Sequence, residues 1–336
     1  MAGNFVQLHN HTHYSLLDGA SKVPDLVKRV KELDMPAVGI TDHGNMHGAY
    51  ELWRAAVDSG VKPIIGIEAY VTPETARQDK TRVSWDTNWT PVPGHARNPD
   101  DVSGGGLITH LTMWAENDEG LVNLIKASSV ANLEGRVMRY PRMDKEVLST
   151  YSKGVIASSG CPSGIIQTRL RLGQFDEALR AAGEFQDIFG KDNFYIELMD
   201  HGLSIESKVT GDLLTIAKKL GAPLLATNDS HYVMEADKDA QDAMLCINSG
   251  ATLDDPNRFK FEGSGYYIKS AEEMRELFKD HPDACDNTLE IAERCNVIFD
   301  DHEDGAFMPQ FDCPEGWDET SLFLKKVEEG LEKRYD

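Results

Sequence analysis

The sequence predicts an α/β fold in which short strands alternate with helices around a parallel sheet. Most of the β-rich runs are followed by an amphipathic helical stretch, and no internal repeat is visible along the 336 residues. Alternation of strand and helix is typical of a parallel sheet. Seven such units predict either a barrel or a large doubly wound sheet, and an apolar content of 40% is sufficient for a packed core.

The expected strands are short apolar runs, namely Phe5–Leu8, Ala37–Thr41, Ile64–Val71, Leu107–Leu111, Gly154–Ser159, Phe194–Leu198 and Leu224–Thr227. Helical patterns follow most of them, at Val23–Leu33, Met46–Ser59, Glu119–Leu133, Gln174–Phe189 and Glu206–Leu220. The stretch 74–106 interrupts this rhythm, because it is rich in Pro, Gly, Asp, Asn and Arg and ends in three consecutive glycines. We expect a long, partly mobile insertion loop there, on the active face of the fold.

Beyond about Ser270 the chain changes character. Helices are expected at Ala271–Lys279, Pro282–Cys295 and near Glu319–Tyr335, with an acidic stretch before the last of them and no further strand. We therefore expect a barrel domain over residues 1–275 and a helical segment over residues 276–336 that begins another domain.

Composition argues against several classes of protein. The apolar runs are too short and too often interrupted to span a bilayer, and the N-terminus lacks the pattern of a secretory signal, so we expect a cytoplasmic protein with no membrane partner. Five cysteines without paired spacing argue against a disulfide framework. A net charge of −22 disfavours nonspecific DNA binding, unless bound cations reverse the local sign or basic surfaces lie elsewhere in a longer protein.

Potential metal ligands lie at the strand ends where α/β barrels carry their catalytic residues. His9 and His11 end the first run, and residues two apart point to the same side of a strand. The other candidates are His43, Glu68, His110, Cys161, Asp229 and His231, with Asp18 in the first loop. A single histidine of this kind is more often a hydrogen-bonded structural residue. Packing does not explain the repetition in successive units, which predicts a site for several metal ions.

The residues around these candidates resemble the PHP (polymerase and histidinol phosphatase) superfamily. The resemblance runs through LHNHTHYSLLDG, GITDHGNM, GIEAYV, THLTMWAEN, SSGCPSG and ATNDSHYV. The intervening segments GLVNLIKASS, QTRLRLGQ, YIELMDHG, DPNRFKFEG and GYYIKSAEEM resemble the alpha subunits of bacterial DNA polymerase III, of the actinobacterial kind. The final residues, from FMPQFDCPEG onwards, resemble the segment that enters the palm domain of those polymerases.

The resemblance implies a distorted seven-stranded (β/α)7 barrel with three divalent metal ions, zinc and/or manganese. It assigns a first metal to His9, His11, Glu68 and Asp229, a second to Glu68, His110 and Cys161, and a third to Asp18, His43 and His231. Glu68, Asp229 and His11 would be the residues closest to catalysis. A cysteine thiolate favours zinc, whereas imidazole and carboxylate positions also accept manganese.

The function implied is 3′→5′ exonuclease proofreading within a replicative polymerase, by a metal-activated water. DNA 3′ ends, the remaining polymerase domains and replisome subunits such as the sliding clamp would be the partners. The polymerase active site itself is not expected in this chain. The alternatives are a small-molecule phosphatase of the histidinol-phosphatase type and a non-catalytic, metal-stabilised docking module.

Weaker candidates lie beside these motifs. Arg142 and Arg169 could grip substrate phosphates, as could Arg139 and Arg171, although ordinary surface arginines are the slightly favoured interpretation. His201 is more compatible with an outer position or a contact to substrate than with a metal ligand. Asp42 could orient the neighbouring His43.

Overall fold

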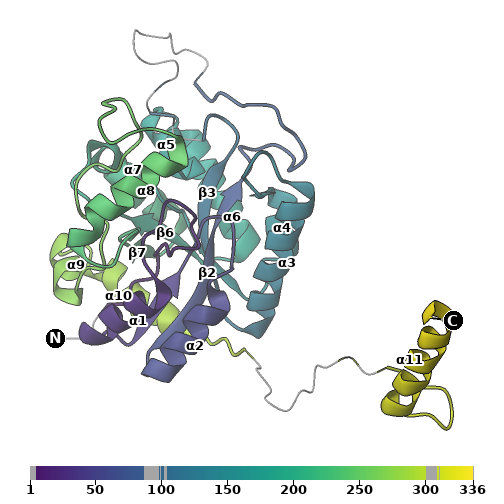
Figure 1. Ribbon diagram of the computed structural model, residues 1–336. Helices are drawn as coiled ribbons and strands as arrows, with labels where there is room; N and C mark the ends of the chain where they lie inside the picture. Colours follow the sequence, from purple (N-terminus) through teal and green to yellow (C-terminus); the bar gives the residue numbers. More distant parts are fainter. Residues whose placement is uncertain are drawn as a thin grey trace. The chain divides into compact units, whose positions relative to one another are not determined.

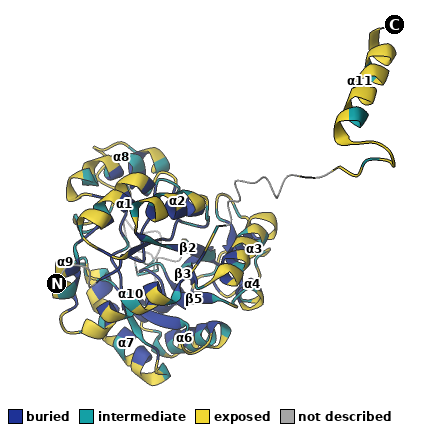
Figure 2. Ribbon diagram, turned by 90° about the horizontal axis from the view of Figure 1, so that it is seen from below, coloured by how far each residue is buried: buried dark blue, intermediate teal, exposed yellow. Residues whose placement is uncertain are grey.

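The computed structural model describes residues 5–86, 98, 100–101, 104–299, 309 and 311–335. The chain divides into two compact units, Met1–Ile298 and Phe299–Asp336. The first unit contains a curled sheet with helices around it (Figure 1). Figure 2 shows the buried strands in dark blue among helices whose outward faces are yellow. The expected α/β class is therefore confirmed.

The sheet has seven strands, and the last of them in the chain, β7, lies at the opposite end of the sheet from β1. The strands are β1 (Ala37–Ile40), β2 (Lys62–Val71), β3 (Thr109–Ala115), β4 (Arg142–Met143), β5 (Val155–Ser158), β6 (Phe194–Leu198) and β7 (Leu224–Ala226). Their order is β1-β2-β3-β5-β6-β7, and the two-residue β4 pairs with β2 outside this path. The curled, seven-stranded form expected from the resemblance is confirmed.

The N-terminal segment closes the curl instead of forming the expected strand Phe5–Leu8. It makes single parallel bridges, from Gln7 to Val38 of β1 and from Asn10 to Ser230 just after β7. The His11 amide donates to the Ser230 carbonyl at 2.8 Å, which fixes the segment beside the end of β7. One short piece of chain thus spans the gap between the first and last strands and carries His9 and His11 with it.

Strand β3 corrects the expectation of an all-parallel sheet. It runs antiparallel to β2, with Val71 opposite Thr109, and antiparallel to β5. The reason lies in the connection: the described part of the segment between β2 and β3 contains no crossover helix, and an antiparallel neighbour needs none. His110 is consequently at the start of β3, which is the same rim of the barrel where the parallel strands end.

The expected helices are present with small shifts at their ends. They are α1 (Val23–Glu32), α2 (Ala49–Ser59), α3 (Asp118–Glu134), α6 (Phe175–Phe189), α7 (Ser204–Leu220), α9 (Ala271–Leu277), α10 (Pro282–Arg294) and α11 (Glu319–Tyr335). Three further helices, α4 (Lys145–Thr150), α5 (Ile165–Arg171) and α8 (Lys238–Ser249), were not expected from the sequence, and neither was the short 3-10 turn η1 (Glu235–Asp237). Helix α1 shows how the pattern works, since its buried residues are Val23, Leu26, Val27 and Val30.

Helix α10 closes the floor of the barrel. Ile291 and Cys295 are fully buried in a cluster with Val6, Ile64 and Trp114. The Val6 amide also donates to the Thr288 hydroxyl at 3.1 Å. The expected domain boundary at residue 275 therefore falls inside the first unit, because this helix supplies apolar surface that the strands need. The second unit contains α11, none of whose residues is buried.

The described part of the insertion is anchored at its base. The Val83 amide donates to the Gly106 carbonyl at 2.9 Å, and Gln174 donates to the carbonyl of the buried Trp85. Residues 87–97, 99 and 102–103, on which the expectation of a mobile loop also falls, lie outside the described residues. Within the described residues, no helix has the length and apolar character needed to cross a membrane.

Candidate metal centre

The structure brings all nine sequence-predicted ligands together at one rim of the barrel. They come from separate segments: the N-terminal segment, the loop that carries Asp18, the ends of β1, β2 and β7, the start of β3, and the loop after β5. The atoms of three overlapping groups lie within 4.8 Å of one another: His11 with His43 and His231, His9 with His11 and Asp229, and His43 with Glu68 and His110. The convergence places imidazoles and carboxylates at metal-ligand spacing.

Glu68 is the hub of the cluster. Its Oε1 lies 3.4 Å from His9 Nε2, and its Oε2 lies 2.6 Å from His43 Nδ1 and 3.1 Å from His110 Nδ1. The side chain is 1% exposed, so both oxygens are removed from bulk water. Cys161 Sγ extends this side of the cluster and lies 3.4 Å from His110 Nδ1. Glu68 therefore lies between His9 on one side of the cluster and His43 and His110 on the other.

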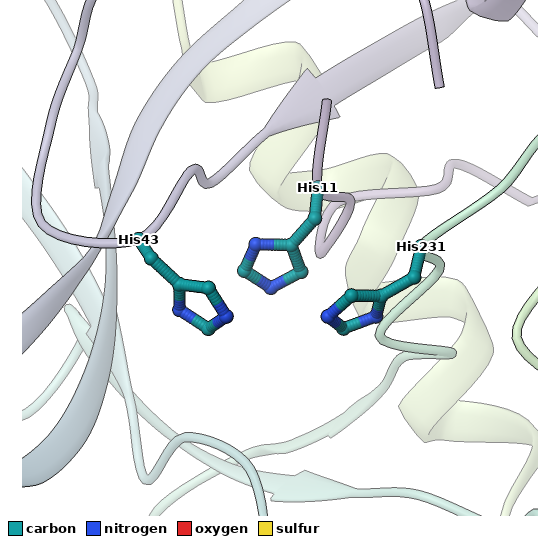
Figure 3. A group of neighbouring side chains, drawn as sticks. All are labelled: His11, His43 and His231. Atoms are coloured by element: carbon teal, nitrogen blue, oxygen red, sulfur yellow. The ribbon is translucent and has the colours of Figure 1, made fainter. Parts of the chain in front are cut away.

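The remaining ligands form two neighbouring sets. Asp229 Oδ1 lies 3.3 Å from His9 Nε2 and 3.1 Å from His11 Nε2. Asp18 Oδ2 lies 2.9 Å from His43 Nε2 and 3.6 Å from His231 Nε2. His11 is the contact between the two sets: its ring centroid is 4.1 Å from that of His43 and 4.3 Å from that of His231. Figure 3 shows these three rings side by side.

Hydrogen bonds behind the cluster fix how two of the histidines present their nitrogens. His9 Nδ1 donates to Glu197 Oε1 at 2.7 Å, because an ionised carboxylate only accepts. His231 Nδ1 donates to the Asp229 carbonyl oxygen at 2.8 Å. Each of these bonds places a proton on Nδ1 and directs Nε2 at the cluster, so loss of the Nε2 proton gives the form that binds a metal.

His11 is oriented through a serine. Ser15 Oγ donates its only proton to Asp42 Oδ1 at 2.7 Å and therefore accepts from His11 Nδ1 at 2.9 Å. Asp42 also accepts from the amide and the hydroxyl of Thr12. The expectation that Asp42 orients His43 is thus wrong: its carboxylate is already engaged by Thr12 and Ser15, and it acts on His11 instead.

Glu197 is the residue that sequence reasoning missed. It lies in β6, is 1% exposed, and accepts from His9, Ser158 and Thr227. A signal was available, since a lone glutamate inside the apolar run Phe194–Leu198 requires a buried partner just as Glu68 does. The β6 unit therefore supplies a buried carboxylate that orients the candidate ligand His9.

Burial and charge together keep the carboxylates ionised. Burial opposes the charge of Glu68, but His110 and His43 outweigh it and hold the pKa of the Glu68 carboxyl well below its usual range. For Asp229, burial again opposes the charge, and His9 and His231 lower its pKa. These acids stay charged at neutral pH, so the centre carries the negative charge that attracts a divalent cation.

Burial and the same neighbouring charges also shift the pKa values of the imidazoles and of the Cys161 thiol. Burial opposes the charge on His9, yet Asp229 and Glu197 raise its pKa well above the ordinary value. The pKa of His11 falls to about 3, because burial and the neighbouring charges of His43 and His231 disfavour its proton. Burial, then the charges of Glu68 and Asp229, raise the pKa of the Cys161 thiol. A cation in this cluster would replace protons as the balancing charge.

Unpartnered buried atoms show that the donor set fits metal ions. Buried polar atoms in folded proteins are normally hydrogen-bonded. Several here have no hydrogen-bond partner and point into the same space: His9 Nε2, His11 Nε2, Asp18 Oδ1, His43 Nδ1, both oxygens of Glu68, Asp229 Oδ1 and His231 Nε2. A mixed set of imidazole nitrogens, carboxylate oxygens and one sulfur suits zinc or manganese.

Backbone constraints tighten the rim. Asp229 has a φ of 44°, in the left-handed region that few residues other than glycine adopt. Gly19 has no room for a side chain, because an added Cβ would lie 2.2 Å from the Thr12 carbonyl oxygen. The tight approach of these two segments keeps Asp18 beside the histidines.

The weaker predictions for Arg142 and Arg169 are wrong. Arg142 is fully buried and donates to the carbonyls of Gly135, Leu107, Arg77 and Asp79, so it ties loops together. Arg169 is 8% exposed; it donates to Glu74 and Gln174 and stacks over Trp85 at 4.2 Å. Both guanidinium groups are engaged in hydrogen bonds within the fold, so they are not placed to bind a substrate phosphate.

His201 and two other arginines complete the survey of the weaker predictions. His201 lines the cavity beside the centre, but its Nδ1 donates to Glu206 and its Nε2 contacts the Asn228 carbonyl at 2.9 Å, so neither nitrogen is free for substrate. Arg171 is buried and donates to the carbonyls of Asp100 and Pro162. Arg139 alone of the four arginines is exposed.

Two grooves meet at the metal centre. The first, of about 810 Å³, is lined by Phe259, Phe261 and Tyr266 and is called the aromatic groove below. The second, of about 740 Å³, is lined by Arg136, Arg139 and Tyr140 and is called the arginine groove. Both contain Asp18, His43, His110, Ser163 and Phe259, so the centre lies at their junction.

Comparison with known proteins agrees with this site. The model of the PHP domain family matches residues 7–201. The DNA polymerase III subunit alpha of Mycobacterium leprae is 51% identical over 99% of this chain and 28% of its own length. The subunit of the same name from Saccharopolyspora erythraea is 51% identical over 98% of the chain and 28% of its own length. The expected likeness to actinobacterial sequences is confirmed.

More distant matches follow the same pattern. The DNA polymerase III subunit alpha of Borreliella burgdorferi is 39% identical over 98% of this chain and 27% of its own length. The chain thus spans little more than a quarter of the curated relatives named here. The match to the family model covers more than half of the 336 residues and includes seven of the nine candidate ligands. The chain belongs to the PHP domain family.

Proposed function

We propose that this chain is a metal-dependent phosphoesterase that removes nucleotides from the 3′ ends of DNA. The observation that carries the proposal is the set of unpartnered nitrogen and oxygen atoms at the barrel rim, at the junction of two grooves. Such atoms are costly to bury without a partner, and a cluster of divalent cations satisfies them together.

The residues present are sufficient for three divalent ions. His9, His11, Asp229 and Glu68 would hold one, and Glu68 would bridge to a second with His110 and Cys161. Asp18, His43 and His231 would hold the third. When bound, such ions supply positive charge that acidifies water and stabilises the charge that develops on a phosphate during displacement. The Cys161 thiolate favours zinc at its position, and the other two positions also accept manganese.

The chain's own groups orient the reaction. Glu197, Ser15 and the Asp229 carbonyl hold three imidazoles in one tautomer, so little rearrangement is needed when substrate arrives. In the net reaction, the oxygen of water bonds to phosphorus and the bond from phosphorus to the 3′ oxygen of the preceding nucleotide breaks. That oxygen receives the proton that water gives up. The products are a nucleoside 5′-monophosphate and a strand shortened by one unit.

The choice of DNA rests on the relatives, which are named as DNA polymerase subunits. We propose that the chain acts as a proofreading part of such a polymerase. The remaining polymerase domains in the same polypeptide, and replisome subunits such as the sliding clamp, would then be its partners. Residues 276–336 would lead towards a palm domain that carries polymerisation.

The experiment combines metal analysis with a digestion assay. The chain, purified without chelators, should contain two to three transition-metal ions and should shorten a 3′-labelled oligonucleotide. Glu68→Gln removes the bridging charge at nearly constant shape and should lower the rate by about a hundredfold or more. Glu119→Gln, at an exposed position of helix α3, is the matched control.

Three results would contradict the proposal. Less than one ion per chain would remove its chemical basis. Rapid hydrolysis of a small phosphate monoester, with no action on oligonucleotides, would instead identify a small-molecule phosphatase. A fully metal-loaded chain that hydrolyses neither substrate would identify a structural module.

A further inference from the structure

The two grooves differ in chemistry although they share the metal centre. The arginine groove contains, outside the candidate ligands, only Arg136 and Arg139 as lysine, arginine, aspartate or glutamate side chains among the described residues. Both are exposed. In a chain with a net charge of −22, a groove with this local excess of positive charge is an unusual surface. It suits a phosphate backbone, since arginine recognises phosphate through several parallel donors.

An aromatic path connects the arginine groove to the centre. The Arg139 guanidinium lies 5.3 Å from the Tyr140 ring, and the Tyr140 and Tyr70 rings are 5.0 Å apart. Tyr70 in turn stacks on His43 with ring centroids 5.9 Å apart. Arg139 also donates to Asn248, which holds it along the wall of the groove. A strand that lies on this path would have its phosphates near arginine and its bases near flat rings.

The aromatic groove has a different lining. The Phe261 ring is 4.6 Å from that of His231, and the Phe259 and Phe261 rings are 5.8 Å apart. Its Lys208 is paired with Asp100 at 2.6 Å, and its Glu206 is bonded to His201. Its charged groups are therefore partly paired with one another, while Phe259 is 62% exposed at the junction of the grooves. An exposed ring at this point suits an uncharged planar group such as a nucleobase.

From this asymmetry we infer that single-stranded nucleic acid binds across the metal centre in one direction. The base of the 3′-terminal nucleotide stacks on Phe259 at the aromatic groove, and the phosphates upstream of the scissile bond lie along Arg136 and Arg139. This inference rests on the proposed function, to which it adds the substrate's polarity and the residues that read it.

The arrangement has a consequence for selectivity. A terminal base can stack on Phe259 only after it has left its partner strand. A frayed or mismatched end therefore enters the site at a lower free-energy cost than a paired end. Stacking of a base on an aromatic side chain offsets part of the cost of opening one terminal pair. The inferred site therefore favours unpaired 3′ ends without reading their sequence.

The arginine groove is tested with Arg136→Ala/Arg139→Ala in this 336-residue chain. On a 3′-labelled single strand, KM should rise by about tenfold while kcat changes by less than about twofold. Lys28→Ala/Lys153→Ala is the matched control, because both lysines are at least 76% exposed, lie outside the groove linings, and remove the same charge. On a strand whose upstream phosphates are neutral methylphosphonates, the arginine variant and the parent chain should have equal KM. An equal rise in KM for both double variants would overturn the assignment.

The aromatic groove is tested with Phe259→Ala. It should lower kcat/KM by about tenfold on a strand with a normal 3′ base and leave it unchanged on a strand that ends in an abasic sugar. Leu253→Ala is the matched control, because this side chain is also exposed and apolar but lies outside both groove linings. A loss of equal size on both strands would show that Phe259 supports the centre without stacking on a base.

Binding measurements separate this inference from the proposed function. Fluorescence anisotropy with a labelled, uncleaved single strand follows binding even if the chain hydrolyses nothing. Weaker binding by the arginine variant, and unchanged binding by the lysine variant, would support the strand track whatever the catalytic result. Hydrolysis by the parent chain, with both groove variants equal to it in KM and in binding, would retain the proposed function and reject the track.

Discussion

The floor and the rim of the barrel are built from the same strands but differ in polarity and in hydrogen bonding. At the floor, Trp114 donates to the Leu8 carbonyl, and Ile291 of α10 fills the space below the sheet. At the rim, Glu68 and Asp229 keep buried oxygens without hydrogen-bond partners, and Asp229 has a strained backbone. The floor is apolar and its polar groups are hydrogen-bonded, whereas the rim is polar and has buried atoms without hydrogen-bond partners.

This difference indicates where stability and chemistry reside. Burying an apolar side chain such as Ile291 stabilises the fold by about 1.5–3 kcal/mol, and the floor contains many such side chains. The rim holds buried ionisable side chains at close range, and burial of such charges away from water is unfavourable. Changes at the rim should therefore act on metal binding and catalysis, and changes at the floor on unfolding.

The largest effect is expected from Asp229→Asn. The amide keeps the shape of the side chain but loses the charge that faces His9 and His11, so hydrolysis of a 3′-labelled strand should fall by about a hundredfold or more. Circular dichroism should show an intact fold, because the floor is unchanged. Hydrolysis at the parent rate would show that Asp229 has no part in the catalytic centre.

Removal of the metals tests whether the rim also contributes to stability. The candidate ligands come from segments far apart in sequence, so ions that join them bind the folded state alone. At a metal concentration of about 100 times Kd this contributes about 2.7 kcal/mol. Verified chelation should lower Tm by about 5 °C or more, and readdition of zinc or manganese should restore it. An identical melting curve before and after chelation would separate the rim from the stability of the barrel.

A smaller effect is expected from Glu197→Gln. This side chain touches His9 but no candidate metal position, so it acts through the orientation of the imidazole. Metal affinity should fall between about tenfold and a hundredfold, and excess metal should restore most of the rate. A Glu290→Gln variant, on the exposed side of α10, serves as the control. A rate that excess metal does not restore would indicate a role beyond positioning.

The smallest effect is expected at the floor from Ile291→Val. Loss of one buried methylene should lower the free energy of unfolding by about 0.5–1.5 kcal/mol in a denaturant titration. Metal content and kcat should equal those of the parent chain. A loss of bound metal in this variant would show that floor and rim are coupled, contrary to the contrast drawn above.

Much of the rim could be predicted from the sequence because ligand chemistry is restricted to few residue types. His9, His11 and Glu68 stand out in apolar surroundings, where such side chains require a partner. Glu197 carries the same signal inside a strand, as Glu68 does, but sequence reasoning did not single it out. The pattern of residue types located the centre, while the hydrogen bonds that orient it depend on neighbours that only the folded chain brings together.

The arginines show where sequence reasoning fails. Arg142 and Arg136 lie six residues apart in similar company, yet one is enclosed by backbone carbonyls and the other lines a groove. The difference depends on the antiparallel direction of β3 and on the base of the insertion. There the carbonyls of Arg77 and Asp79 accept hydrogen bonds from Arg142. No local pattern encodes that antiparallel direction, because the stretch between the two strands has no periodicity from which the direction of β3 could be predicted.

The hairpin-like connection between β2 and β3 also makes the barrel tolerant of change at one point. Val71 and Thr109 face each other in the ladder, so the ends of the intervening segment are already adjacent. The entropy of closing such a loop grows only with the logarithm of its length, by about 0.6 kcal/mol for each doubling. A segment of different length can therefore be exchanged there, provided that the residues at its base that bind Arg142 are kept. Each exchanged segment would emerge beside His110. A change at this one junction could therefore alter the surface next to the candidate metal centre while the rest of the chain stays the same.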